Sequence, residues 1–335
     1  MRRSIDRQRV QLWYGWLHHH SSGTSAYALE KQLLPEGFAH ASDGTVSHRN
    51  RMSRYRDGKH VPRRDLVARA EMLFPGGQAL LDHPYWEILD PDRALFINAG
   101  PWLARLGADV QRLMLKSGRA IGDHRAQRRT TTSISLRQME NLGTLDALAA
   151  TALLLREALQ IGNASRALYC ASSFWRLLLL IGSSVPFVEL LPAMAELADE
   201  ALLHQVVYQG KQVTLASVPI RRYESLLSDY CLDLEDAGKL RPDHDSWTRA
   251  RLLLIRGMKG HDFLHAFRVP VVATPALRAD PEKYARFLRD QIVCRMAFGY
   301  CGSTRWANRN FEGDLWTFYN DPEGRWPTID SPPSE

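Results

Sequence analysis

Cationic and amide side chains gather between residues 47 and 64, and their chemistry suits contact with nucleic acid. Arginine can donate two hydrogen bonds to guanine, asparagine can pair with adenine, and further cations neutralise phosphate. We expect base contacts from Arg49, Asn50, Arg51 and Arg54, on one helix with Ser47 and Arg56, and phosphate contacts from Lys59, Arg63 and Arg64. The alternative is a solvated basic helix that touches no nucleic acid.

Two histidines, His261 and His265, lie four residues apart with Asp262 between them. On a helix this spacing places both imidazoles on one face, as in zinc helices of the H-E-x-x-H type, with aspartate in the glutamate position. The shorter aspartate reaches a metal-bound water less easily, and Gly257 and Gly260 weaken the helix. We therefore interpret these histidines as ordinary surface or half-buried residues and expect no metal and no cofactor.

A second basic stretch offers a secondary phosphate contact, with a solvated loop as the alternative. It contains His124, Arg125, Arg128 and Arg129. The sequence has no G-x-S-x-G nucleophile motif, no G-x-x-x-x-G-K phosphate loop and no G-x-G-x-x-G fingerprint. Nothing therefore indicates an enzyme that uses those loops.

The positive charge is unevenly distributed along the chain. Residues 1–75 contain 13 Lys+Arg and 7 Asp+Glu, whereas residues 76–335 contain 30 of each. The whole net charge of +6 therefore lies in the first quarter. This asymmetry favours a polyanion-binding module joined to a neutral body, and a basic surface kept for solubility is the alternative.

The remaining composition is that of a globular protein, with 45% hydrophobic and 24% charged residues over 335 positions. The four cysteines form no C-x-x-C pair and no secretory leader is evident, so we expect a cytoplasmic protein. Arg176, Gly182 and Pro186 interrupt the most apolar stretch, residues 167–188. This stretch is therefore expected to be a buried core helix and not a membrane span.

Several short helices are expected to position the first basic cluster. Ser25 can cap a helix through Leu33, and Thr45 or Ser47 can cap the next helix, which Gly58 would end. Pro62 would open the following helix, and Pro75-Gly76-Gly77 would close a basic helix-turn-helix-like module over residues 1–77.

The run from Asn50 through Phe74 resembles the recognition helix, glycine-to-proline turn and following helix of the lambda-repressor/Cro-type helix-turn-helix family, with Ala28–Leu33 as the preceding helix. The resemblance covers roughly fifty residues and has a loose motif. It implies that Ser47–Arg56 enters the major groove of DNA. This chain departs from the family because about ten residues, 35–44, separate the two central helices in place of a tight turn.

The fold class expected for the whole chain is mainly α, with one short β-hairpin. After the module we expect a packed Pro/Gly-rich connector at residues 78–101, an α-helical sensor or partner domain at 102–300, and an aromatic-rich segment at 301–335 that docks on the body. Expected helices cover residues 101–116, 136–181 with a break at Gly162-Asn163, 186–205, 222–237, 246–267 and 281–298, with a hairpin around Gly210.

We accordingly expect a DNA-binding protein, such as a transcriptional regulator or a mobile-element or defence-associated factor. The helical domain would bind a ligand, bind a protein partner or form a homodimer. RNA in place of DNA stays open. The alternatives are a metal-dependent enzyme that acts on nucleic acid or nucleotides through His261, Asp262 and His265, and a helical scaffold protein that binds no nucleic acid.

Overall fold

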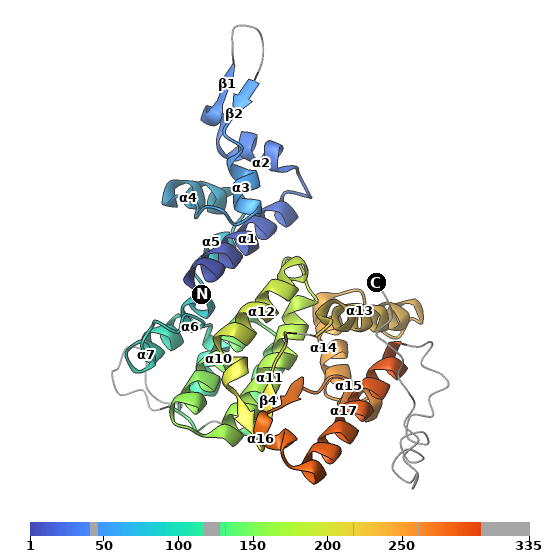
Figure 1. The fold of residues 1–335 in the computed structure, drawn as a ribbon. Helices are drawn as coiled ribbons and strands as arrows, with labels where there is room; N and C mark the ends of the chain where they lie inside the picture. Colours follow the sequence, from blue (N-terminus) through green and yellow to red (C-terminus); the bar gives the residue numbers. More distant parts are fainter. Residues whose placement is uncertain (41–45, 117–127, 131, 217, 260, 303–335) are drawn as a thin grey trace.

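The computed structural model describes residues 1–40, 46–116, 128–130, 132–216, 218–259 and 261–302, and only the backbone at residues 39–40, 46–48, 261 and 302. The described chain is mainly helical, so the predicted fold class is confirmed. Figure 1 shows the first helices and a hairpin projecting as a module from a larger helical body.

The N-terminal module contains five helices and a two-stranded antiparallel hairpin. Its elements are α1 (Arg2–His20), α2 (Ala26–Leu33), β1 (Phe38–His40), β2 (Val46–His48), α3 (Arg51–Arg56), α4 (Arg64–Leu73) and α5 (Gly77–Leu81), with a short 3-10 turn at Pro35–Gly37. The Ser25 hydroxyl accepts the Ala28 N–H at 3.2 Å, which confirms the predicted cap of α2.

Helix α1 contributes to two hydrophobic cores. Trp13 and Leu17 are buried among the residues of the module, whereas Ile5 and Leu12 are buried in the core of the body. Gln8 also donates from Nε2 to a carbonyl of the body, that of Ala193, at 2.6 Å. One helix therefore links the module to the body through both apolar and polar contacts.

The body is built from α6 to α17. The helices are α6 (Pro84–Ile88), α7 (Leu95–Arg105), α8 (Ala108–Met114), α9 (Ser133–Leu142), α10 (Leu145–Gln160), α11 (Ala164–Gly182), α12 (Leu191–Ala201), α13 (Ile220–Asp236), α14 (His244–Ile255), α15 (His261–Ala266), α16 (Pro275–Arg278) and α17 (Pro281–Gly302). Short 3-10 turns at Val188–Leu190 and Leu203–Gln205 flank α12.

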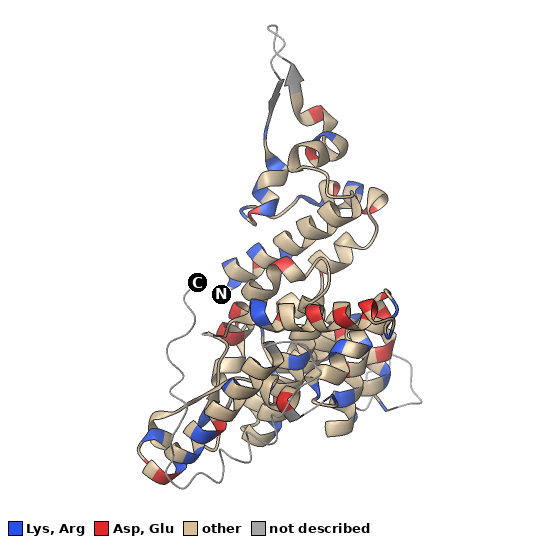
Figure 2. Ribbon diagram, turned by 90° about the vertical axis from the view of Figure 1, so that its right-hand side faces the viewer, with Lys and Arg blue, Asp and Glu red and all other residues tan. Residues whose placement is uncertain are grey.

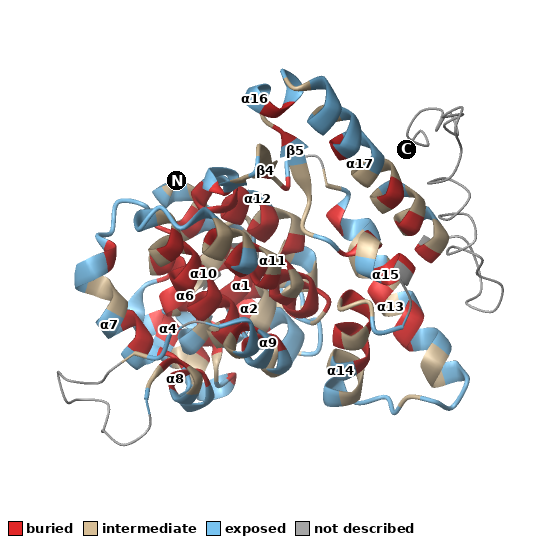
Figure 3. Cartoon of the chain, turned by 90° about the horizontal axis from the view of Figure 1, so that it is seen from below, coloured by how far each residue is buried: buried red, intermediate tan, exposed pale blue. Residues whose placement is uncertain are grey.

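The core of the body lies around α10 and α11, which pack against each other and carry the longest runs of buried residues (Figure 3). Gly162, in the short link between the two helices, has φ +68°. The side chain of the next residue, Asn163, caps α11 by accepting the Arg166 N–H at 3.0 Å. The predicted break at Gly162-Asn163 is therefore confirmed, because a left-handed glycine and a capping asparagine encode it locally.

A three-stranded antiparallel sheet lies beside these helices. It consists of β3 (Val207–Tyr208), β4 (Lys211–Val213) and β5 (Val271–Ala273), in the order β3-β4-β5. The predicted hairpin around Gly210, which has φ +74°, is confirmed. Strand β5, which comes about sixty residues later in the chain and pairs with β4, was not predicted.

Three polar contacts, made by two carboxylates, tie the helices of the body together. Glu140 of α9 is 1% exposed, and its carboxylate pairs with Arg176 at 3.1 Å and Arg256 at 2.8 Å. His83, which caps α6, contacts the Asp146 carboxylate at the start of α10 with Nε2 at 3.1 Å. Each contact joins segments that are far apart in the sequence.

Three predicted helices of the body have the wrong extent. The helix expected from residue 136 to the break at Gly162 is divided at Gly143, which has φ +58°. The helix expected at residues 101–116 begins at Leu95 and is divided at Gly107, whose backbone N–H contacts Asp146. The helix expected at residues 246–267 is divided at Gly257, which has φ +70° and would place a Cβ atom 2.4 Å from the Leu264 Cβ. These breaks follow from contacts with distant elements or from a left-handed glycine.

The predicted connector at residues 78–101 includes α5, α6 and the start of α7, and its Trp86, Ile88 and Leu89 side chains are buried as expected. Of the segment predicted to dock at residues 301–335, residues 303–335 lie outside the described part of the chain.

Candidate nucleic-acid interface

Helix α3 is anchored in the core of the module by two side chains. Met52 and Tyr55 are buried, and the Tyr55 ring meets Trp13 of α1 edge-on with 5.7 Å between ring centroids. A six-residue helix is unstable alone, so these contacts hold it. Arg54 and Arg56 on the same helix are exposed.

A buried carboxylate fixes the start of α3. Glu30 of α2 is 1% exposed, and its Oε2 accepts a hydrogen bond from the Met52 N–H at 3.3 Å. Asn50 precedes the helix with φ 51° and does not cap it through its side chain. Glu30 therefore satisfies a backbone donor in the first turn, where negative charge is also favoured.

The turn after α3 lies directly against α1. Gly58 has φ +64°, and a Cβ atom there would lie 2.5 Å from Arg7 Cγ and 2.7 Å from the Arg7 carbonyl oxygen. Gln11 of α1 also donates from Nε2 to the Arg56 carbonyl at 3.4 Å. The predicted glycine stop is confirmed, since only glycine combines this backbone conformation with this close approach. The turn brings exposed Arg7 beside the basic residues.

We call residues 49–64 the basic segment. It contains seven Lys or Arg residues and one Asp, a net charge of +6 that equals the net charge of the whole chain. Every one of the seven cations is exposed except Arg51, which is half-buried. Figure 2 shows this charge along α3 and around the turn that follows it.

Two of these cations share the only carboxylate of the segment. Asp57 lies 2.8 Å from Lys59 Nζ and 3.4 Å from Arg56 Nε. The hydrogen bond from Lys59 lowers the pKa of the Asp57 carboxyl. Both cations keep about 60% of their side-chain surface exposed, 59% for Arg56 and 65% for Lys59, so a polyanion can still approach them.

The other five cations are available for an external anion. Arg49, Arg51, Arg54, Arg63 and Arg64 form no ion pair with any residue that the structure describes. Burial raises the pKa of the Tyr55 phenol, and the charges of Arg51 and Arg63 oppose this rise. The starts of α3 and α4 therefore place positive charge around the same phenol, although twelve positions separate the two arginines in the sequence.

The predicted helix from Ser47 to Arg56 is wrong in its first turn. Ser47 lies on β2, where it pairs with Ala39 of β1, and Arg49 and Asn50 precede α3. The single helix expected to carry Ser47, Asn50 and Arg54 therefore does not exist. Strand pairing with a segment eight residues earlier prevails over the local helical signal.

The expected secondary phosphate contact is only partly within the described chain. Arg128 forms an ion pair with Glu157 of α10, and Arg129 donates from Nε to the Leu115 carbonyl at 2.7 Å. Burial lowers the pKa of the Arg128 guanidinium. His124 and Arg125 lie outside the described residues. The two described arginines thus have contacts within the protein.

The expected histidine pair lies on α15, as the spacing requires. Asp262 between the histidines is buried, and the Cys301 thiol donates to its Oδ2 at 3.9 Å. Among the described residues, no group of three or more His, Cys, Asp or Glu side chains is arranged to hold a metal ion. The side chain of His261 is not described.

No family model, curated protein or solved structure matches the chain. The resemblance to Cro-type helix-turn-helix proteins therefore stays a prediction. Between α2 and α3 this chain has the β1–β2 hairpin where that family has a tight turn. None of the helices within the described ranges has the length and hydropathy needed to cross a bilayer.

Proposed function

We propose that the protein binds duplex DNA through the basic segment of its N-terminal module. The observation that carries this proposal is the presence of five arginines without ion pairs to described residues, within sixteen consecutive residues of a projecting module. A folding role does not require such charges, because exposed cations add little to stability. Attraction to the phosphate backbone of DNA accounts for these exposed charges.

Backbone contact is the main expected mode of binding. Helix α3 has only six residues, so it presents at most Arg51, Arg54 and Arg56 to a groove. Arg63 and Arg64 lie at the start of α4, where phosphate oxygens are also favoured by the helix dipole. We therefore propose that phosphate contacts dominate affinity and that Arg54 is the principal candidate for a base edge.

Salt dependence of binding tests this proposal. If all five unpaired arginines meet phosphates, the slope of log K against log salt is about −4.5, and affinity falls about 500-fold between 50 and 200 mM salt. The full chain would be titrated against a fluorescent DNA duplex by anisotropy, with single-stranded DNA and an RNA duplex as parallel probes.

The Arg51→Ala/Arg54→Ala double variant provides the residue-level test. We expect affinity for the DNA duplex to fall at least about tenfold and the slope to lose roughly two units. Its matched control is Lys239→Ala/Arg241→Ala, which removes two exposed cations of the body that form no ion pair with described residues. The control should change neither quantity.

Three results would overturn the proposal. They are salt-independent binding, equal effects of the two double variants, and no binding of any nucleic acid at low salt. The last result would favour the helical scaffold. Tighter binding of the RNA duplex than of the DNA duplex would replace DNA by RNA as the partner.

A further inference from the structure

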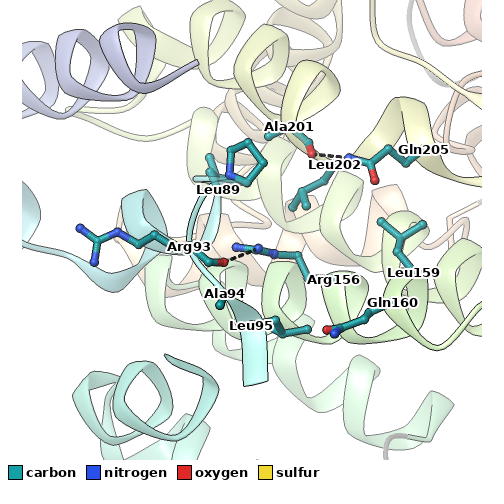
Figure 4. Close-up of a pocket in the computed structure, with 11 residues that line it drawn as sticks. Leu89, Arg93, Ala94, Leu95, Arg156, Leu159, Gln160, Ala201, Leu202 and Gln205 are labelled. Carbon is teal, nitrogen blue, oxygen red and sulfur yellow. Dashed lines mark hydrogen bonds between the residues drawn. The ribbon is translucent and has the colours of Figure 1, made fainter. Parts of the chain in front are cut away.

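A cavity of about 360 Å³ lies in the body, away from the basic segment. Three segments form it: the link between α6 and α7, the last turns of α10, and the end of α12 (Figure 4). Its size falls in the range of pockets that hold small organic ligands. The cavity does not depend on the proposed contact with DNA.

Arg156 of α10 provides the charged wall of this cavity. Its Nη1 donates to the carbonyl oxygens of Ile88 at 2.7 Å and Asp90 at 3.1 Å, and its Nη2 donates to the Arg93 carbonyl at 2.8 Å. A guanidinium has five N–H donors, so Nε–H and one Nη2–H have no acceptor among the described residues. These two donors belong to adjacent nitrogens of one guanidinium.

Backbone carbonyls leave the positive charge of Arg156 without a direct ion pair. The carboxylate of Asp90, whose charge acts on Arg156, instead accepts the Asp92 N–H at 3.1 Å and lies 3.8 Å from Arg93 Nε. Burial lowers the pKa of Arg156, while Asp90 opposes this change. An anionic group from outside would therefore complete the contacts of this side chain.

The second arginine of the lining does not compete for such a group. Arg93 pairs with Glu87 at 3.0 Å, and its side chain extends away from the cavity in Figure 4. Two adjacent N–H groups match two oxygens of a carboxylate or of a phosphate. A carboxylate has no further oxygen, whereas a bound phosphate or sulfate would keep its other oxygens and part of its charge without a second unpaired cation among the described residues of this lining. The rest of the lining includes Leu95, Leu159 and Leu202, which suit an apolar body.

We propose that this cavity binds a small organic carboxylate, with the carboxylate on the Nε–H and Nη2–H of Arg156 and the apolar body against the leucines. The amide side chains of Gln160 and Gln205 complete the lining. They add polar groups without negative charge, and the described residues of the lining include no carboxylate.

Isothermal titration calorimetry of the full chain tests this site without nucleic acid. The probes are benzoate and 4-methylpentanoate, each compared with its uncharged amide, together with inorganic phosphate. We expect at least one carboxylate to bind and its amide to bind roughly tenfold more weakly or worse, because the amide cannot replace a charge-assisted contact. Phosphate should bind more weakly than that carboxylate.

Two variants separate the cavity from the fold. Arg156→Lys keeps the charge but removes the paired donors, and it should weaken carboxylate binding roughly tenfold. Arg156 also donates to three backbone carbonyls, so its replacement changes contacts of the fold as well as of the cavity. Ala94→Trp therefore gives a second test. Ala94 is an exposed residue of the lining, and a large ring there fills the cavity. Ala237→Trp, at an exposed position outside the cavity, is the matched control.

We expect Ala94→Trp to abolish carboxylate binding and Ala237→Trp to leave it unchanged. Equal binding of acid and amide, preference for phosphate, or unchanged binding in a folded Ala94→Trp variant would overturn the proposal. Absence of a binding signal for both carboxylates would overturn it as well. Each outcome is independent of DNA binding, because no nucleic acid is present.

Discussion

Replacement of Gly58 by alanine tests whether the turn after α3 holds the basic segment against α1. The backbone at Gly58 has φ +64°, and the new Cβ atom would lie 2.7 Å from the Arg7 carbonyl oxygen and 2.5 Å from Arg7 Cγ. The side chain of Arg7 can move, but its carbonyl belongs to the backbone of α1. The turn or the helix must therefore shift.

Gly162→Ala is a close control for this change. Gly162 has nearly the same backbone conformation, with φ +68°, but no atom lies within 4 Å of the Cβ position. Left-handed strain should cost about 1–2 kcal/mol in both variants. Overpacking adds about 1–3 kcal/mol at Gly58 alone, so the free energy of local unfolding should fall by about that much more at Gly58.

Amide hydrogen exchange followed by mass spectrometry can measure this difference in peptides that cover α3 and α1 of the full chain. An extra loss of 1–3 kcal/mol corresponds to exchange that is about 5- to 150-fold faster at Gly58→Ala than the strain alone would give. Exchange near Gly162 in its own variant supplies the strain value. If both variants lose the same protection around the substituted turn, the close approach of Gly58 to α1 does not constrain the module.

Three further changes test contacts that hold the fold. Glu140→Gln should lower the free energy of unfolding by about 3 kcal/mol because it leaves two arginines without their buried anion. Glu189→Gln, which removes an 84% exposed carboxylate from its pair with Arg221, should cost less than about 1 kcal/mol in the same denaturant titration. Burial raises the pKa of Asp146, but the hydrogen bond with His83, the charge of His83 and the hydrogen bond from the Gly107 N–H together outweigh it, so the folded pKa is lowered. The stability that this shift contributes is present above the unfolded value of about 3.9 and is lost as pH falls through the lower folded value. Asp146→Asn should therefore flatten the acid limb of stability below about pH 4, and an unchanged limb would contradict this reasoning. Glu30→Ala removes the acceptor of the Met52 N–H, so it should speed amide hydrogen exchange in α3 and weaken binding of the DNA duplex. Glu36→Ala, which removes the exposed carboxylate that pairs with Arg69, should do neither.

Local signals in the sequence were sufficient for much of the fold. The helices joined at Gly162-Asn163 could be predicted because dense apolar residues, a left-handed glycine and a capping asparagine all lie within the segment itself. The hairpin at Gly210 could be predicted because its alternating pattern and its left-handed glycine also lie within the segment itself. Strand β5, with only three residues, could not, since its strand character depends on pairing with β4.

The candidate interface was also only partly predictable from the sequence. The concentration of cations between residues 49 and 64 is a property of composition and was visible directly. The start of α3 could not be read from the sequence. Glu30 of α2 accepts a backbone N–H there, and residues expected to form the first turn of the helix pair with β1 instead. The position of Arg7 beside Gly58 also depends on tertiary packing. A charge pattern can thus locate a surface without giving its shape.

The two cores of α1 decide how the interface should be tested. Ile5 and Leu12 are buried in the body, and Leu81 of α5 is buried in the module although it lies beyond residue 77. A fragment of residues 1–77 would therefore expose two large apolar side chains and lose a third, each worth about 1.5–3 kcal/mol when fully buried. Failure of such a fragment to bind DNA would report on its folding. Only charge removal in the full chain, where α1 keeps both sets of contacts, isolates the contribution of the arginines to binding.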